Sequence, residues 1–384
     1  MFNFSTLPPL SLYIHIPWCV RKCPYCDFNS HELREGLPED QYIDALIADL
    51  ESELPHVWGR SIQSIFIGGG TPSLFSAESI DRLLCAIRAR LPYRSDMEIT
   101  LEANPGAIEA ARFKELRAAG INRLSIGVQS FDDGLLQRIG RIHNGLEAQK
   151  AIDTALAAGF ENFNLDLMFG LPEQTENISR SDIQTAIESG ASHLSFYQLT
   201  IEANTAFYAK PPQLPDDENI WTMQDQCHEL LAAAGFEQYE VSAFSKPGKQ
   251  CQHNLNYWHF GDYLGVGAGA HGKITDAFQQ NITRRSKLRH PADYMQKVSS
   301  AAHVSEEHVL KHREVGLEFM MNALRLHGGF PVPLFNSHTG LPLTVVEKAL
   351  KEAEERGLIE WDVHRIQPTE RGRHFLNDLL GLFV

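Results

Sequence analysis

The segment Cys19-Val-Arg-Lys-Cys23-Pro-Tyr-Cys26 places three cysteines in a C-x3-C-x2-C pattern directly after a short apolar run. Three thiolates at this spacing can each ligate one iron of a cubane iron–sulfur cluster, which usually takes four cysteines. A set of three leaves one iron open to a small molecule. Taken alone, the pattern also fits a structural zinc knuckle, for which His15 or His31 would be the fourth ligand.

The length and composition allow one barrel-sized domain and a smaller second one. The chain has 384 residues, 43% of them hydrophobic, and a formal net charge of −15. This acidic balance argues against nucleic acid as a general partner, because no positive field attracts phosphates. One basic run, residues 283–290, is the local exception and could meet an anionic partner or a membrane surface.

The cysteine usage and hydropathy pattern predict a cytoplasmic protein. Three of the six cysteines lie in one short cluster, which differs from a secreted disulfide scaffold and fits a reducing compartment. We expect neither a signal peptide nor a transmembrane helix, since no stretch approaches about 20 uninterrupted apolar residues. Peripheral contact with the inner membrane rests on the basic run alone.

Short β-branched runs alternate with longer helical patterns, which predicts an α/β fold with a parallel sheet. Strands are expected at residues 12–16, 62–67, 97–101, 123–128, 163–168 and 193–199, with an irregular strand at 240–243. Helices such as 107–119 and 146–158 lie between them, with Gly120 and Gly159 at their stop positions. Six such units predict a partial (β/α)6-type barrel over residues 1–281.

From about residue 282 the pattern changes, and residues 282–384 are expected to form a small α-rich, winged-helix-like domain. Helical stretches at 306–326 and 344–356 precede two short strands at 357–361 and 365–369. Winged helices often bind DNA, but this one is not notably basic. Its expected role is to cover or brace the barrel.

Polar residues stop several of the predicted strands. In β/α barrels the active site forms where the carboxyl ends of the strands meet, so these side chains should share one face with the cysteine loop. The residues are Glu102, Gln129, Asp166 and Gln198. The run of glycines at 68–70 lets backbone approach a ligand closely, carboxylates suit ribose hydroxyls, and Arg141 could hold a carboxylate.

Five motifs together resemble the oxygen-independent coproporphyrinogen oxidase family of the radical S-adenosylmethionine (SAM) superfamily. They are Tyr13-Ile-His15-Ile-Pro-Trp-Cys19 through Cys26-Asp27-Phe28, Gly68-Gly-Gly-Thr71-Pro-Ser73, Glu102-Ala-Asn-Pro105, Gly127-Val-Gln129-Ser-Phe131 and Asp166-Leu-Met-Phe-Gly170-Leu-Pro172. The resemblance implies that Cys19, Cys23 and Cys26 hold a [4Fe–4S] cluster. It also implies that SAM is bound by Tyr13, Tyr25, Gly69, Gly70, Thr71, Glu102, Gln129, Arg141 and Asp166.

Three departures place the sequence nearer to the haem chaperone branch of this family than to the oxidases. The oxidases carry a further cysteine where this chain has Phe28, and they have a long segment where only eighteen residues precede Cys19. In addition, the run from His253 through Asn254, Asn256 and Tyr257 to Trp258 matches the H-N-x-x-Y-W motif of the chaperone branch.

The motif suggests contact with haem. Histidine is the usual protein ligand of haem iron, and Tyr257 and Trp258 offer flat faces to a porphyrin. His253 is the first candidate ligand, and Cys251 and His271 are others. The alternative is an aromatic loop that packs against the barrel with His253 buried.

The resemblance therefore implies a haem chaperone that carries haem as cargo to haem-dependent respiratory proteins and keeps a SAM-ligated [4Fe–4S] cluster. Homodimer formation and the turnover of SAM stay open. Two other functions remain as alternatives. One is oxidative decarboxylation of coproporphyrinogen III, and the other is radical SAM modification of RNA, which the acidic charge opposes.

Overall fold

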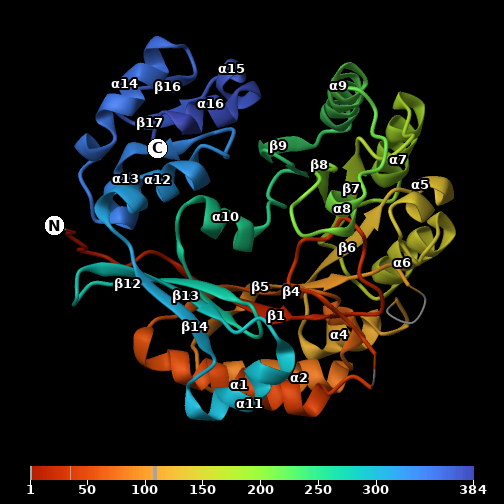
Figure 1. Cartoon of the computed structure of the whole chain (residues 1–384), viewed down its shortest axis with the longest axis horizontal. Helices are drawn as coiled ribbons and strands as arrows, with labels where there is room; N and C mark the ends of the chain where they lie inside the picture. The colour runs from red at the N-terminus through yellow and green to blue at the C-terminus, as the bar shows by residue number, and fades with distance from the viewer. Residues whose placement is uncertain (1, 35, 107–109) are drawn as a thin grey trace.

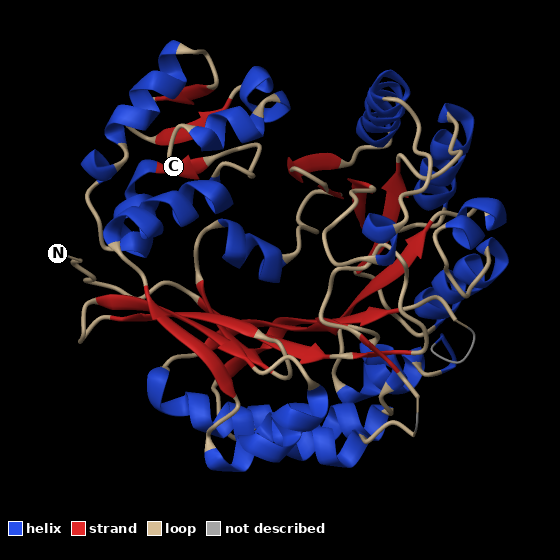
Figure 2. Cartoon of the chain, in the orientation of Figure 1, coloured by secondary structure: helices blue, strands red, loops and turns tan. Residues whose placement is uncertain are grey.

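A computed structural model describes residues 2–34, 36–106 and 110–384. Its main feature is a curved, open 12-stranded sheet with helices along its outer face (Figures 1 and 2). The strand order is β14 (Val304–Val309), β13 (Asn281–Lys287), β12 (His271–Asp276), β11 (Asp262–Val266), β1 (Leu10–Ile16), β4 (Ile62–Gly69), β5 (Tyr93–Ala103), β6 (Arg123–Gln129), β7 (Phe163–Phe169), β8 (His193–Gln198), β10 (Ala243–Ser245) and β9 (Glu237–Glu240).

The strands from β11 to β8 in this order are all parallel, as the alternating pattern predicted for β1 and for β4 to β8, whereas β11 was not predicted. Strands β1 and β7 are buried along nearly their whole length, which is typical of parallel strands covered on both faces. The flanking strands β12 to β14 on one side and β10 and β9 on the other are antiparallel. The sheet is thus open, and the expected partial barrel is confirmed.

The outer helices bury one apolar face each against the sheet. In α2 this face consists of Ile80, Leu83, Leu84 and Ile87, spaced by three or four residues as a helix requires. The helices that contribute to this core are α1 (Glu39–Glu53), α2 (Ala77–Arg88), α4 (Phe113–Ala119), α6 (Gly145–Ala157), α7 (Glu176–Glu188), α9 (Asp217–Ala233) and α11 (Pro291–Lys297). Other short helices are α5 (Asp133–Arg138), α8 (Ala206–Ala209) and α10 (Gln252–Trp258).

The predicted helix limits were partly correct. Gly120 ends α4 with a positive φ of 118°, a conformation that glycine adopts without steric cost. The start of the predicted helix at 107–109 lies outside the described residues. The strand expected at 240–243 was wrong in its limits, because Glu240 ends β9 and Ala243 begins β10, and these two strands pair antiparallel.

A separate small unit lies above one end of the sheet (Figure 1). It has an apolar core, to which Phe4, Phe260 and Ile282 from the rest of the chain also contribute, and a 3-stranded sheet in the order β15-β17-β16. Its elements are α12 (His312–Ala323), β15 (Phe330–Pro331), α13 (Val332–Thr339), α14 (Glu347–Glu355), β16 (Ile359–Trp361), β17 (Arg365–Pro368), α15 (Glu370–His374) and α16 (Leu376–Gly381). The order helix, strand, strand, helix from α14 to α15 agrees with the winged-helix-like prediction.

The expected domain boundary between residues 281 and 282 falls inside β13. Because β13 and β14 pair within the large sheet, we propose that residues 281–309 belong to the first domain. The helix expected from residue 306 instead begins at His312, after β14. We propose that the C-terminal unit starts near Leu310, which packs in its core.

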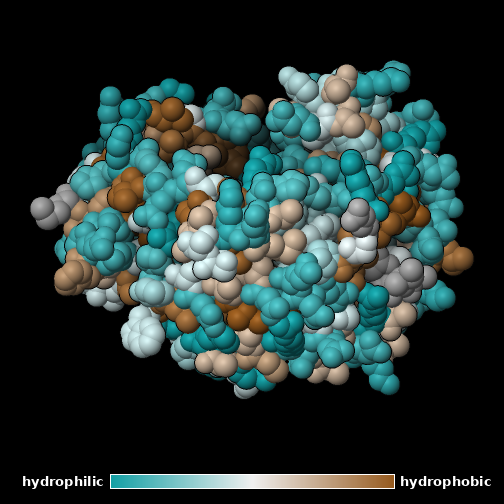
Figure 3. Space-filling view, turned by 60° about the horizontal axis from the view of Figure 1, so that its bottom comes forward, coloured by the Kyte–Doolittle hydropathy of each residue, from teal (hydrophilic) through white to brown (hydrophobic). Residues whose placement is uncertain are grey.

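Hydrophilic residues cover most of the face seen in Figure 3, and hydrophobic residues gather there only in small patches. Within the described residues, no helix combines the length and the apolar character that crossing a lipid bilayer would take.

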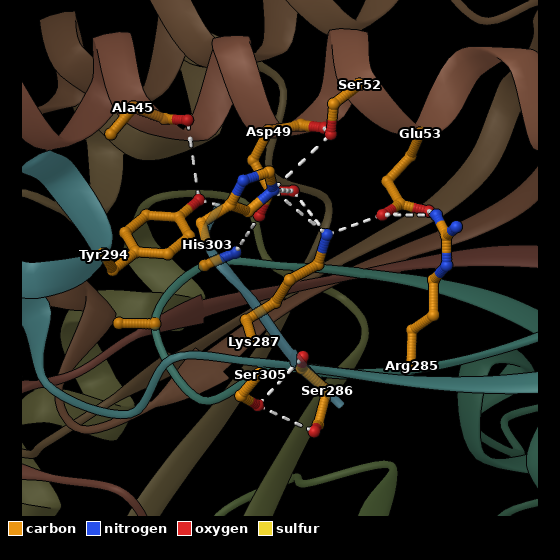
Figure 4. Close-up of polar contacts among 12 residues, drawn as sticks. Ala45, Asp49, Ser52, Glu53, Arg285, Ser286, Lys287, Tyr294, His303 and Ser305 are labelled. Carbon is orange, nitrogen blue, oxygen red and sulfur yellow. Dashed lines mark hydrogen bonds and ion pairs between the residues drawn. The ribbon is translucent and has the colours of Figure 1, made fainter. Parts of the chain in front are cut away.

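The basic run at 283–290 is largely neutralised inside the protein. Arg284 pairs with Glu318, and Arg285 pairs with Glu53 and Glu307. Lys287 is only 1% exposed, and its ammonium lies 2.7 Å from Asp49 and 2.5 Å from Glu53 of α1 (Figure 4). These three cations therefore join strands and helices of the fold, so the run does not form a continuous positive surface.

Candidate cofactor site

The cysteine loop leaves the carboxyl end of β1 and is held by the glycine run at the end of β4. The amide of Gly70 donates to the carbonyl of Ile16, and the amide of Thr71 donates to the carbonyl of Trp18, each at 2.7 Å. A Cβ atom on Gly70 would lie 2.5 Å from the carbonyl oxygen of Trp18. The glycines thus let two backbone segments meet, which fixes the start of the loop at β2 (Trp18–Cys19).

One cavity of about 510 Å³ collects most of the predicted site. Its lining includes all three cysteines and the predicted SAM residues Tyr25, Gly69, Gly70, Thr71, Glu102, Gln129, Arg141 and Asp166. Such a volume is within the range of ordinary ligand sites. Tyr13 lies instead in a neighbouring cavity, with its hydroxyl 2.9 Å from Nδ1 of His15.

The three cysteines are half-buried free thiols in this cavity. Burial raises the pKa of Cys19 to about 11, and a metal bound there would deprotonate its thiol ligands. Among the described residues, no three His, Cys, Asp or Glu side chains are arranged to share a single metal ion. A cubane cluster does not require three side chains around one ion, because each thiolate ligates a different iron. The donor set fits such a cluster.

Two buried carboxyl groups lie on the strand side of the cavity. Glu102 of β5 accepts a hydrogen bond from the amide of Gly69 at 2.9 Å, yet burial raises its pKa to about 8, and the charge of Asp166 adds to this rise. Asp166 of β7 accepts from Asn164 at 2.8 Å and from Ser125 at 3.1 Å, and burial raises its pKa as well. Both groups can accept hydrogen bonds from hydroxyls of a ligand.

Arg141 connects the cysteine loop to the strand ends. Its Nη2 donates to the side chain of Asn104 and to the carbonyl of Gly127, both at 2.7 Å, and its Nη1 lies 3.4 Å from Sγ of Cys23. Burial by itself would lower the pKa of Arg141, but Tyr25 and Cys23 beside it raise this pKa above its usual value, so the guanidinium stays charged. The guanidinium thereby sets a fixed positive charge beside the thiols.

Gln129 takes an unusual backbone conformation at the end of β6. Its φ of 71° lies in the left-handed region, which costs a residue other than glycine of the order of 1–3 kcal/mol. Its Oε1 accepts a hydrogen bond from the hydroxyl of Tyr197 at 2.7 Å. Backbone strain that holds a polar side chain in a cavity is typical of a functional site.

The cavity also contains residues that sequence reasoning missed. Asn104 bonds to both Thr71 and Arg141, and Tyr197 bonds to Gln129. Asn104 stands two residues after Glu102, and Tyr197 stands one before Gln198, so their positions at strand ends were the available signal.

The H-N-x-x-Y-W residues of α10 are separated by the fold. His253 is 1% exposed, with Nδ1 3.0 Å from the hydroxyl of Ser64. Trp258 stacks under the guanidinium of Arg325 at 4.4 Å. Among His253, Tyr257 and Trp258, which were predicted to contact haem, Tyr257 is the residue that lines the neighbouring cavity, together with Tyr13. Cys251 is fully buried, 3.5 Å from Glu98.

Comparison with known proteins agrees with this arrangement. Residues 13–181 match the radical SAM superfamily, and residues 310–375 match the HemN C-terminal domain. Coproporphyrinogen III oxidase (HemN) from Escherichia coli, a radical SAM enzyme, has the same fold. Its TM-score is 0.82 over 98% of this chain and 90% of that one, at 24% sequence identity.

Curated relatives match over nearly the whole chain. The heme chaperone HemW of Escherichia coli is 50% identical over 98% of this chain and 99% of its own length, and that of Haemophilus influenzae is 50% identical over 98% of each. The heme chaperone HemW of Bacillus subtilis is 36% identical over 97% of this chain and 99% of its own. The chain belongs to the HemW family of the radical SAM superfamily.

Proposed function

We propose that this protein is a cytoplasmic haem chaperone that binds haem as cargo and delivers it to haem-requiring respiratory proteins. The supporting observation is the pairing of two adjoining cavities. The first gathers the three cysteines with strand-end polar groups, and the second, of about 710 Å³, is lined by aromatic and histidine side chains together with polar and charged ones. Relatives that carry the chaperone name match this chain over nearly its full length.

In this proposal Cys19, Cys23 and Cys26 hold a [4Fe–4S] cluster, and SAM occupies the rest of the first cavity. The bound cluster would supply the electron for reductive cleavage of SAM, or gate haem transfer without turnover. The protein contributes orientation and electrostatics. Glu102 and Asp166 would accept from the ligand's hydroxyls, and Arg141 would hold positive charge beside the thiolates.

Two assays on the purified full chain separate chaperone from oxidase. Haem titration should show saturable binding, and anaerobic incubation with coproporphyrinogen III, SAM and a reductant should give no protoporphyrinogen. Robust turnover would instead establish the oxidase. Reconstituted protein should also show a [4Fe–4S] spectrum that Cys19→Ala, Cys23→Ala or Cys26→Ala removes. Stoichiometric zinc without iron in anaerobically purified protein would overturn the cluster assignment.

A further inference from the structure

The second cavity shares a wall with the cluster cavity. Both are lined by Asp27, Phe28, Gly69 and Glu102, and Phe28 is 58% exposed. The remaining walls come from β1, α10, β11 and the antiparallel strands β12 to β14. A ligand here would lie beside the cysteine loop without occupying the SAM positions.

A continuous series of aromatic rings backs this cavity. The rings of Phe66 and His253 have centroids 5.1 Å apart, those of His253 and Tyr257 are 4.9 Å apart, and those of Tyr257 and Tyr263 are 4.3 Å apart. Tyr257 and Tyr263 line the cavity, whereas Phe66 and His253 support them from behind. Tilted and edge-on rings of this kind make a rigid, largely apolar surface against which a flat ligand can pack.

Three imidazoles lie near the cavity, and they differ in availability. His15 is 5% exposed, and both of its nitrogens are engaged, at 2.9 Å by the hydroxyl of Tyr13 and at 2.8 Å by the carbonyl of Asn29. His253 is 1% exposed and does not line the cavity. His271, at the start of β12, is exposed and lines it, and no hydrogen bond within the described residues involves its ring.

Charge at the cavity is also suited to an anionic ligand at one point. Of the two lining cations, Lys287 is held by Asp49 and Glu53, whereas Arg289 is exposed and makes no ion pair within the described part of the chain. Three carboxyl groups, those of Asp27, Glu102 and Glu306, also line the cavity, so Arg289 marks the one side of it where an anionic group would meet an unpaired cation among the described residues.

We infer that the second cavity is the haem site, with His271 as the iron ligand, Tyr257 and Tyr263 against the porphyrin and Arg289 at a propionate. This inference rests on the proposed haem binding. It makes His253 a positioning residue, which supports the ring of Tyr257 from behind. The motif thus contributes the wall of the site, and the ligand comes from the first residue of β12, directly after the glycine-rich loop.

The test is titration of the full chain with ferric haem and, separately, with metal-free protoporphyrin IX. His271→Ala should weaken haem binding about tenfold or more and change the haem absorption spectrum, and added imidazole should restore that spectrum. The affinity of His271→Ala for metal-free protoporphyrin IX should equal that of the wild type, because this ligand has no iron for a histidine to ligate. Arg289→Gln should weaken binding of haem but not of its dimethyl ester. His364→Ala, which removes an exposed histidine of the C-terminal unit, is the matched control.

The outcomes separate this assignment from the function on which it rests. A wild-type chain that binds no haem overturns the proposed function itself. Wild-type binding with an unchanged spectrum and affinity in His271→Ala overturns the ligand assignment. Equal loss of haem and protoporphyrin in that variant would indicate a damaged cavity and would also reject ligation. Loss of the spectrum in His253→Ala, with His271→Ala intact, would assign the iron to His253.

Discussion

The buried ion cluster between α1 and β13 offers a quantitative test of the fold (Figure 4). Lys287→Met keeps the length of the side chain and removes the ammonium that contacts Asp49 and Glu53. Removing one partner of a buried pair costs about 3–5 kcal/mol, because the charge left behind is uncompensated. We expect the lower end of this range.

The lower value follows from the other partners in the cluster. Asp49 still accepts hydrogen bonds from His303 and Tyr294, both at 2.8 Å, and from the amide of Gly267 at 3.0 Å. Glu53 keeps its pair with Arg285 at 3.3 Å. These bonds compensate part of the negative charge, so the free energy of unfolding should fall by about 3 kcal/mol.

The assay is urea unfolding of the apo-protein followed by tryptophan fluorescence, with Lys150→Met, which removes an exposed lysine on α6, as the matched control. The double variant Lys287→Met with Glu53→Gln should regain part of the loss, since it removes one of the stranded charges. A loss below about 1 kcal/mol in Lys287→Met, within the range of surface pairs, would refute the reasoning.

The pH dependence gives a second measure of the same cluster. The partners of Asp49, chiefly His303 and Lys287, hold the pKa of this carboxyl below its usual value against the effect of burial. Its contribution to stability is therefore complete above the unfolded-state pKa of about 3.9 and is lost as the pH falls through the folded-state pKa. As the pH falls through that acid range, the free energy of unfolding should decrease by less in Lys287→Met than in the wild type.

Two further changes test the cofactor site, and a third tests the second cavity. Gly70→Ala, whose Cβ would lie 2.5 Å from the carbonyl of Trp18, should cost about 1–3 kcal/mol and lower the iron content after reconstitution; Gly36→Ala, where nothing lies within 4 Å, should do neither. Glu102→Gln should weaken SAM binding by about tenfold in calorimetry. Since burial raises the pKa of Glu102 to about 8, wild-type stability should fall between about pH 5 and 8, and this variant should flatten the fall; an unchanged slope would contradict the assignment. Asn29→Ala removes two hydrogen bonds to the wall of the second cavity, worth about 1 kcal/mol each, and should weaken haem binding several-fold without loss of iron. A variant that binds haem as tightly as the wild type would show that these two hydrogen bonds do not support the haem site.

The parallel pairing of the strands and the shared edge of their polar residues could be predicted from the sequence, because both follow from local patterns. Strand alternation predicts parallel pairing, and parallel pairing brings Glu102, Gln129 and Asp166 to one end of the sheet. The stop at Gly120 likewise depends on one residue and its neighbours.

Long-range pairing is what the sequence did not reveal. Strand β14 reads VSEEHV, with five exposed residues, and has no apolar face that would distinguish it from the start of a helix. The basic run looked like a surface patch because its carboxylate partners, Asp49 and Glu53, lie more than 200 residues away. The burial of His253 also depends on distant contacts, with Ser64 and Phe66 of β4.

Asn29 shows how the two cavities are joined physically. Its Nδ2 donates to the carbonyls of Ala268 and Arg289 at 2.9 Å each, so the cysteine loop is tied to the glycine-rich loop and to the end of β13. Its own carbonyl can only accept, so Nε2 of His15 must carry the proton in that 2.8 Å bond. Burial lowers the pKa of His15 to about 4, and the neutral ring therefore accepts from Tyr13 through Nδ1. A shift of the loop on cluster binding would thus reach both Tyr13 and Arg289, which face the second cavity.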